Sequence, residues 1–143
     1  MQQDPGFTPA RAVTARVELP YSYSDWKKIA DLHDRRLTSL RTEPGVSIAG
    51  ASNFLPLDAA WRGPFFVQGR PRPRPGDEPQ AQHQTVDDDY FRALGVPLAK
   101  GRFLDARDTA DAPGAIIVND VLARRQWPGE DPVGRSVMSP ISI

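Results

Sequence analysis

The chain contains 143 residues, a length that suits one domain or two small lobes around a shared core. Eighteen basic residues balance eighteen acidic ones, which argues against a surface built to hold nucleic acid or anionic lipid. Cysteine is absent, so a disulfide framework and a thiolate metal site are both excluded.

The N-terminal third of the chain predicts a βαβ unit. Residues 12–19 alternate apolar and polar side chains, which is typical of a half-buried strand. The segment at about 24–41 repeats apolar residues at helical spacing, and Ser22 with Asp25 fits a capping box at its start. Residues 46–52 predict a second strand, which a right-handed crossover would place parallel to the first. The apolar stripe of the helix consists of Trp26, Ile29, Ala30, His33, Leu37 and Leu40.

The middle of the chain predicts short elements around a stiff loop. Phe65–Val67 predicts a short apolar strand, and residues 81–86 alternate as a second one. Between them, residues 70–79 are rich in proline and predict an extended loop. Residues 87–95 predict a short helix with an aspartate cap at its start and a glycine at its end.

The last third predicts two strands and a helix. Residues 96–104 predict an irregular strand interrupted by turn residues. Residues 115–118 are fully apolar and predict a buried strand, after which Asn119 is expected to cap a short helix. The change from the βαβ pattern to these shorter pieces places a boundary between lobes near residues 53–61.

Three groups of side chains could carry chemistry, and each has a structural interpretation that we favour. His33 and His83 lack an HxxxH or HxH partner, so a zinc site is missing its usual spacing. The carboxylates at 87–89 could hold Mg²⁺ or Ca²⁺, but aspartates at a helix start are more typical of capping. Arginines two residues apart at 70–74 would splay along a polyproline II helix, which predicts a solvated loop that can still touch a partner protein.

Motifs for nucleotides and nucleophiles are missing from the sequence. Neither GxxxxGK[ST] nor GxGxxG occurs, and no serine lies in a GxSxG context. The sequence therefore predicts neither a catalytic residue nor a cofactor or metal site. No apolar run approaches the roughly 20 residues of a membrane span, and the N-terminus lacks a signal-peptide pattern. We expect the chain to be soluble when it is expressed alone.

Three blocks of sequence together resemble a known family. They are "DPGFTPARAVTARVELP" with the following "LRTEPGVSIAGAS", then "VDDDYFRALGVPLAKGRFL", and finally "AIIVNDVLARRQWPGEDPVGRSV". In this order they resemble the MacB-like periplasmic core domain of MacB/FtsX-type ABC transporter permeases, over about residues 4–137. The resemblance implies one extracytoplasmic domain over 1–143, of mixed α+β fold. It implies a βαβ porter-like lobe with a mixed sheet at about 10–56 and a second small α/β lobe at about 57–143.

The same resemblance implies that the signature residues serve the shape of the domain. The ring of Trp127 would be buried, Pro128 and Gly129 would reverse the chain, and Gly134 would allow a tight turn. The expected structural residues are Trp26, Tyr90, Phe91, Gly95, Gly101, Asn119, Trp127, Pro128, Gly129 and Gly134.

The function implied by the resemblance is mechanical and not enzymatic. The domain would lie on the periplasmic face of the bacterial inner membrane and transmit conformational change to a substrate or a partner protein. Its partners would be the transmembrane helices of the permease, the cytoplasmic ATPase and a periplasmic partner protein. The family domain continues past Val137 into further strands, so an open sheet edge that pairs with another copy is also expected.

Two other functions remain open from the sequence. The first is a stand-alone module that captures a peptide, lipid or small molecule between its lobes, suggested by the proline-rich loop and by Trp61, Phe65 and Phe66. The second is a metal-dependent hydrolase that uses the carboxylates at 87–89, which we favour least.

Overall fold

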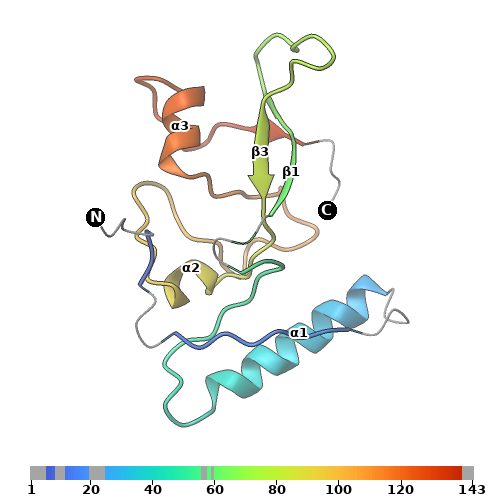
Figure 1. The fold of residues 1–143 in the computed structure, drawn as a ribbon, viewed down its shortest axis with the longest axis vertical. Coiled ribbons are helices and arrows are strands. Elements are labelled where there is room, and N and C mark those ends of the chain that lie inside the picture. The colour runs from blue at the N-terminus through green and yellow to red at the C-terminus, as the bar shows by residue number, and fades with distance from the viewer. Residues whose placement is uncertain (1–5, 9–11, 20–24, 56–57, 59, 140–143) are drawn as a thin grey trace. The chain divides into compact units, whose positions relative to one another are not determined.

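A computed structural model describes residues 6–8, 12–19, 25–55, 58 and 60–139. The described residues form a mixed α+β fold, as expected from the sequence (Figure 1). Its elements are α1 (Trp26–Arg41), β1 (Trp61–Pro64), β2 (Phe66–Val67), β3 (Gln80–His83), α2 (Tyr90–Ala93), α3 (Asp120–Gln126) and β4 (Val137–Met138).

Internal contacts divide the chain into two compact units. The first unit comprises the residues up to Ala51 together with Val86–Pro97, and the second comprises Ser52–Thr85 together with the residues from Leu98 onward. The first unit therefore contains α1 and α2, and the second contains the four strands and α3. The two lobes expected at 10–56 and 57–143 remain a prediction.

Helix α1 is the principal element of the first unit. Asp25 is its N-cap, because the carboxylate accepts hydrogen bonds from the backbone N–H groups of Lys27 at 3.0 Å and Lys28 at 3.4 Å. Asp25 thus caps the helix directly, whereas Ser22 of the predicted capping box lies outside the described residues. Of the predicted apolar stripe, Leu37 is buried, while Leu40 is exposed. The side chain of Trp26 also lies outside the described part of the chain.

The two strands predicted on either side of α1 are wrong. Residues 12–19 are not in a strand, and two side chains of the predicted buried face are exposed, Val13 by 95% and Val17 by 41%. Residues 46–51 are not in a strand either. A strand needs a neighbour that takes up its backbone N–H and C=O groups along its length. In the second segment this contact is confined to its end, where the carbonyl oxygen of Ala51 accepts the N–H of Asp87 at 3.0 Å. Alternation of apolar and polar side chains is therefore not sufficient for a strand, which also needs a pairing partner.

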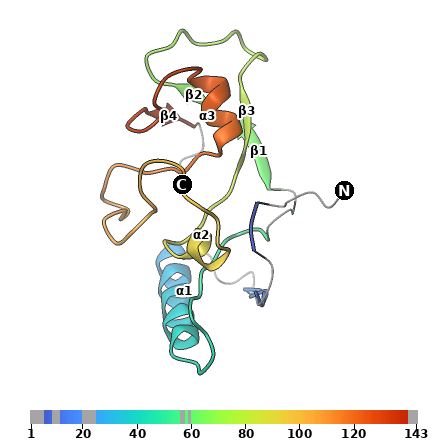
Figure 2. The ribbon, with the colours of Figure 1, turned by 90° about the vertical axis from the view of Figure 1, so that its left-hand side faces the viewer.

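The second unit contains two short antiparallel sheets (Figure 2). Strand β1 pairs with β3, with Trp61 opposite His83, and β2 pairs with β4, with Phe66 opposite Met138. Phe65 separates β1 from β2 and is one of the most buried side chains, at 4% exposure. The chain therefore pairs with β3 before Phe65 and with β4 after it.

The strand expected at 65–67 is confirmed as β2, and the strand expected at 81–86 is confirmed in shorter form as β3. Strands at 96–104 and 115–118 were predicted wrongly, since neither segment is in a strand. Ile116 is exposed, so its apolar side chain is not covered by a second sheet layer. Burial of an apolar run needs such a layer, which the local sequence cannot specify.

Both short helices form where the sequence predicts them. Asn119 accepts a hydrogen bond from the backbone N–H of Leu122 at 2.8 Å and thereby caps α3. Helix α3 ends at the buried Trp127, whose N–H donates to the carbonyl oxygen of Ala123 at 2.8 Å. The buried apolar side chains of the described residues are Leu37 and Tyr90 in the first unit and Phe65 and Trp127 in the second.

Candidate functional site

An ionic cluster joins the end of α1 to the acidic turn before α2 in the first unit. The guanidinium of Arg41 lies 2.8 Å from a carboxylate oxygen of Asp89, 3.4 Å from one of Asp87 and 3.8 Å from one of Asp88. Arg41 also donates to the carbonyl oxygen of Ala49 at 3.0 Å. Arg41 therefore ties the three-aspartate turn to α1, and Arg92 supplies a second cation through Asp89 at 3.2 Å.

The carboxylates of this turn serve both the cluster and the start of α2, because a hydrogen bond from the backbone N–H of Tyr90 is among the contacts that act to lower the pKa of Asp87. Asp89 is the N-cap residue of α2, yet its side chain makes no cap hydrogen bond. Asp87 instead accepts the backbone N–H of Ala51 at 3.0 Å. Burial raises the pKa of Asp87, and the hydrogen bond from Ala51 and the charge of Arg41 act in the opposite direction. Within the described residues, no group of three potential ligands is arranged to hold a metal ion.

Removing Arg41 is expected to destabilise this cluster. The Arg41→Ala variant should lose about 1–2 kcal/mol of unfolding free energy at pH 7, because Asp87 and Asp88 lose their counter-ion and Asp89 keeps only Arg92. The Asp87 pKa is already raised, so its contribution to stability falls as the pH rises through that pKa, and it should fall further without Arg41. Urea denaturation between pH 3 and pH 7 should show the difference between variant and wild type growing with pH. The exposed Arg36, changed to Ala, is the matched control, and an equal loss there would contradict the assignment.

A second ionic network closes a loop in the second unit. Arg102 binds both carboxylate oxygens of Asp108, at 2.7 and 2.6 Å, and Asp108 also accepts the backbone N–H of Asp105 at 2.9 Å. These contacts, first of all the hydrogen bond from Arg102, lower the pKa of Asp108 to about 2. Arg107 in turn pairs with Asp105. The network fixes the path of the chain after Gly101. Its carboxylates, those of Asp105 and Asp108, are both bound by arginines of the same loop.

The two histidines have structural surroundings. His83 lies in β3, where a ring nitrogen is 3.3 Å from the carbonyl oxygen of Gly63 and the ring lies 5.2 Å from that of Trp61. The Trp61 ring covers Gly63 so closely that a Cβ there would lie 1.9 Å from a ring carbon. His33 is half-buried on α1. Neither histidine is paired with a carboxylate among the described residues.

The signature residues expected around α2 lie in the first unit. Tyr90 is buried, and its ring meets that of Phe91 edge to face at 5.3 Å between centroids. Gly95 follows the helix with a φ of +67°, a backbone conformation that glycine adopts readily. The tight packing of this turn is clearest at Gly50, where a Cβ would lie 2.5 Å from the Cα of Tyr90.

The signature residues around α3 lie in two turns. The N–H of Glu130 donates to the carbonyl oxygen of Trp127 at 3.1 Å, across Pro128 and Gly129. The N–H of Arg135 donates to the carbonyl oxygen of Pro132 at 3.1 Å, across Gly134. Both glycines have a positive φ, of +74° and +80°. Gly101 also has a positive φ, and a Cβ there would meet Val133 at 3.5 Å.

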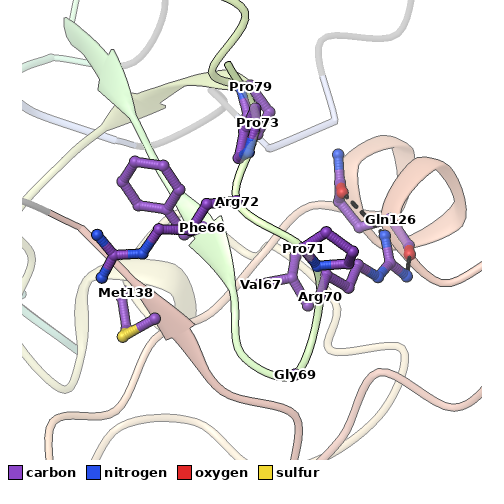
Figure 3. Close-up of a pocket in the computed structure, with 10 residues that line it drawn as sticks. All are labelled: Phe66, Val67, Gly69, Arg70, Pro71, Arg72, Pro73, Pro79, Gln126 and Met138. Carbon is purple, nitrogen blue, oxygen red and sulfur yellow. Dashed lines mark hydrogen bonds between the residues drawn. The ribbon is translucent and has the colours of Figure 1, made fainter. Parts of the chain in front are cut away.

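A hollow of about 130 Å³ lies between the proline-rich loop and the β2–β4 sheet of the second unit (Figure 3). The arginines of the loop diverge, as expected: Arg70 bonds to Gln126, while Arg72 lies over the ring of Phe66 at 5.9 Å. Gln126 and Met138 could not be assigned to this surface from the sequence, since they come from distant segments without a shared motif. The lining residues are Phe66, Val67, Gly69, Arg70, Pro71, Arg72, Pro73, Pro79, Gln126 and Met138.

The described residues thus combine turns that shape the fold, ionic clusters held within the chain and a hollow beside β2. The family model of the MacB-like periplasmic core domain matches residues 8–140. The chain belongs to this family. A search of the curated proteins and a search of the solved structures found no match.

Membership of the MacB-like periplasmic core domain family has three direct consequences. It makes the chain a periplasmic domain of an ABC transporter permease, in a system with a transmembrane permease and an ATPase. It places the domain outside the cytoplasm. It also assigns the chain to transporters rather than to a family of enzymes. No helix among the described residues has the length and apolar character of a membrane span.

Proposed function

We propose that this periplasmic domain transmits conformational change from the membrane-spanning part of the permease to a substrate or a partner protein, without catalysing a reaction. The observation that carries the proposal is the family membership over residues 8–140. A periplasmic domain attached to transmembrane helices moves when ATP-driven steps move those helices. Its role then depends on transferring that movement through a folded body.

The side chains best suited to catalysis are engaged in contacts that hold the fold, which supports a non-enzymatic role. Arg41 holds the carboxylates of the 87–89 turn, and Asp87 also binds the backbone at Ala51. His83 lies against Gly63 and Trp61 within the β1–β3 sheet. A general base needs a free position beside its substrate, and these groups are occupied by their own chain.

The division into two units supports a mechanical role. The chain passes between the units at 51–52, 85–86 and 97–98, so a displacement of one unit acts on the other through several covalent links. Inter-domain motion is the default expectation for units of this kind. A domain with two units and such links is suited to convert movement of the membrane helices into movement at its periplasmic surface.

The proposal is tested by comparing shape variants with chemistry variants in the full permease. ATP turnover by the permease and its ATPase, reconstituted in vesicles, should fall with Trp127→Ala, which removes a buried ring. Turnover should stay near the wild-type level with His83→Gln and with Asp88→Asn, whose carboxylate is the farthest from Arg41. The opposite order of effects, with a normally folded domain, would overturn the non-enzymatic role.

A further inference from the structure

The hollow beside β2 is bounded by cationic side chains on two sides and is apolar at its base. Figure 3 shows Arg72 on the side of Phe66 and Met138, and Arg70 on the side of Gln126. Met138 is 46% exposed, so a large apolar side chain of the lining faces solvent. The hollow therefore presents an apolar contact between two guanidinium groups.

The loop carries Asp77 and Glu78 as well as its three arginines, but these carboxylates do not line the hollow. Arg72 and Arg74 form no ion pair with the described residues, and Arg70 binds an amide and a carbonyl oxygen rather than a carboxylate. Some arginines elsewhere in the same unit are paired, as Arg102 is with Asp108 and Arg135 is with Glu130, whereas Arg62 and Arg125, like Arg72, form no ion pair with the described residues. In a chain of zero net charge, this loop keeps guanidinium groups available for an external anion.

The loop that carries these arginines is held at both ends. At its start the N–H of Arg70 donates to the carbonyl oxygen of Val67 at 3.2 Å. At its end the carbonyl oxygen of Pro79 accepts the N–H of Phe65 at 3.0 Å. A turn at its tip joins the N–H of Asp77 to the carbonyl oxygen of Arg74 at 2.9 Å. Proline restricts the backbone between these points. A ligand bound here would order little additional chain, which reduces the entropic cost of binding.

We propose that this hollow binds an extended acidic segment of a partner protein, with one apolar side chain in the hollow and carboxylates on either side of it. The volume of about 130 Å³ suits a single side chain and is below the 300–1000 Å³ typical of pockets for drug-sized ligands. The diverging arginines fit carboxylates on both sides of an anchor better than one flat anionic surface. This inference rests on the proposed function, because it names the class of partner that receives the movement.

Binding of a defined peptide to the 143-residue chain tests the inference. The probe is the fluorescein-labelled peptide GSEELEEGS, and binding is followed by fluorescence anisotropy. We expect saturable binding that weakens in 0.5 M NaCl, since exposed ion pairs are screened by salt. Replacing the glutamates by glutamine, or the leucine by glycine, should each weaken binding several-fold.

Charge reversal at the hollow provides the matched comparison. Arg72→Glu should weaken binding of the acidic peptide by about 5- to 10-fold and should improve binding of the lysine peptide GSKKLKKGS. Arg36→Glu makes the same charge change on α1 and should leave both affinities unchanged. Equal losses in the two variants would overturn the inference.

A preference of the wild type for vesicles of phosphatidylglycerol over the peptide would overturn it in favour of a membrane surface. Neither result would affect the comparison of ATP turnover, so a failure here is distinguishable from a failure of the proposed function.

Discussion

Replacing Trp127 with Ala is expected to lower the free energy of unfolding by about 3–5 kcal/mol. Trp127 is 5% exposed. Together with Phe65 it is buried in the second unit, among the residues that the structure describes. Its backbone also closes α3 and opens the following turn, through hydrogen bonds with Ala123 and Glu130. A domain of this size is stable by only about 5–15 kcal/mol, so the loss is a large fraction of the total.

Urea denaturation followed by far-UV circular dichroism measures this loss without depending on tryptophan fluorescence. Trp61→Ala is the matched control, because it removes the same side chain from the same unit at a site that is 47% exposed. Its ring contacts His83 across the β1–β3 sheet, and a cross-strand pair of this kind contributes up to about 1 kcal/mol. Equal destabilisation by the two substitutions would show that Trp127 is not a core residue.

Gly50→Ala is expected to cost about 3 kcal/mol through a steric clash in the first unit. The new Cβ would lie 2.5 Å from the Cα of Tyr90 and 2.6 Å from its backbone nitrogen. Tyr90 is buried and begins α2, so its backbone cannot move away without displacing the helix. The position therefore requires glycine for space, even though its backbone dihedral angle φ does not demand it.

Thermal unfolding by circular dichroism, with urea titration for the free energy, checks this prediction. Gly114→Ala is the control, because a Cβ at Gly114 meets no atom within 4 Å and its φ is not positive. That substitution should leave stability within about 1 kcal/mol, with a small gain from the restricted unfolded chain. Similar losses at both glycines would mean that Gly50 is not packed against the turn at Tyr90.

Elements defined by neighbouring residues could be predicted from the sequence. Helix α1 ends at Arg41 as its pattern indicated, and Asn119 caps α3 because an N-cap interaction spans only a few residues. The divergence of Arg70 and Arg72 followed from the geometry of a proline-rich chain. For both helices the decisive interaction lies within a few positions of the residue concerned.

Interactions between distant segments could not be predicted in the same way. The strand pattern at 12–19 could not reveal whether another segment would pair with it. Arg41 binds the Asp87 carboxylate 46 positions later, and Gln126 binds Arg70 of a loop 56 positions earlier, without a motif that connects them. The hollow beside β2 depends on such contacts, so it could be located only in the three-dimensional structure.

The most direct test of mechanical transmission is the distance between the two units in different nucleotide states. The chain has no cysteine, so Ser39→Cys in α1 and Ala110→Cys in the second unit provide two exposed labelling sites in a permease otherwise free of cysteine. Electron spin resonance on the reconstituted transporter would compare the nucleotide-free and the ATP-bound states. A shift of the distance distribution between these states is the predicted result. Identical distributions in a transporter that turns over ATP normally would contradict the proposal that this domain transmits movement between its units.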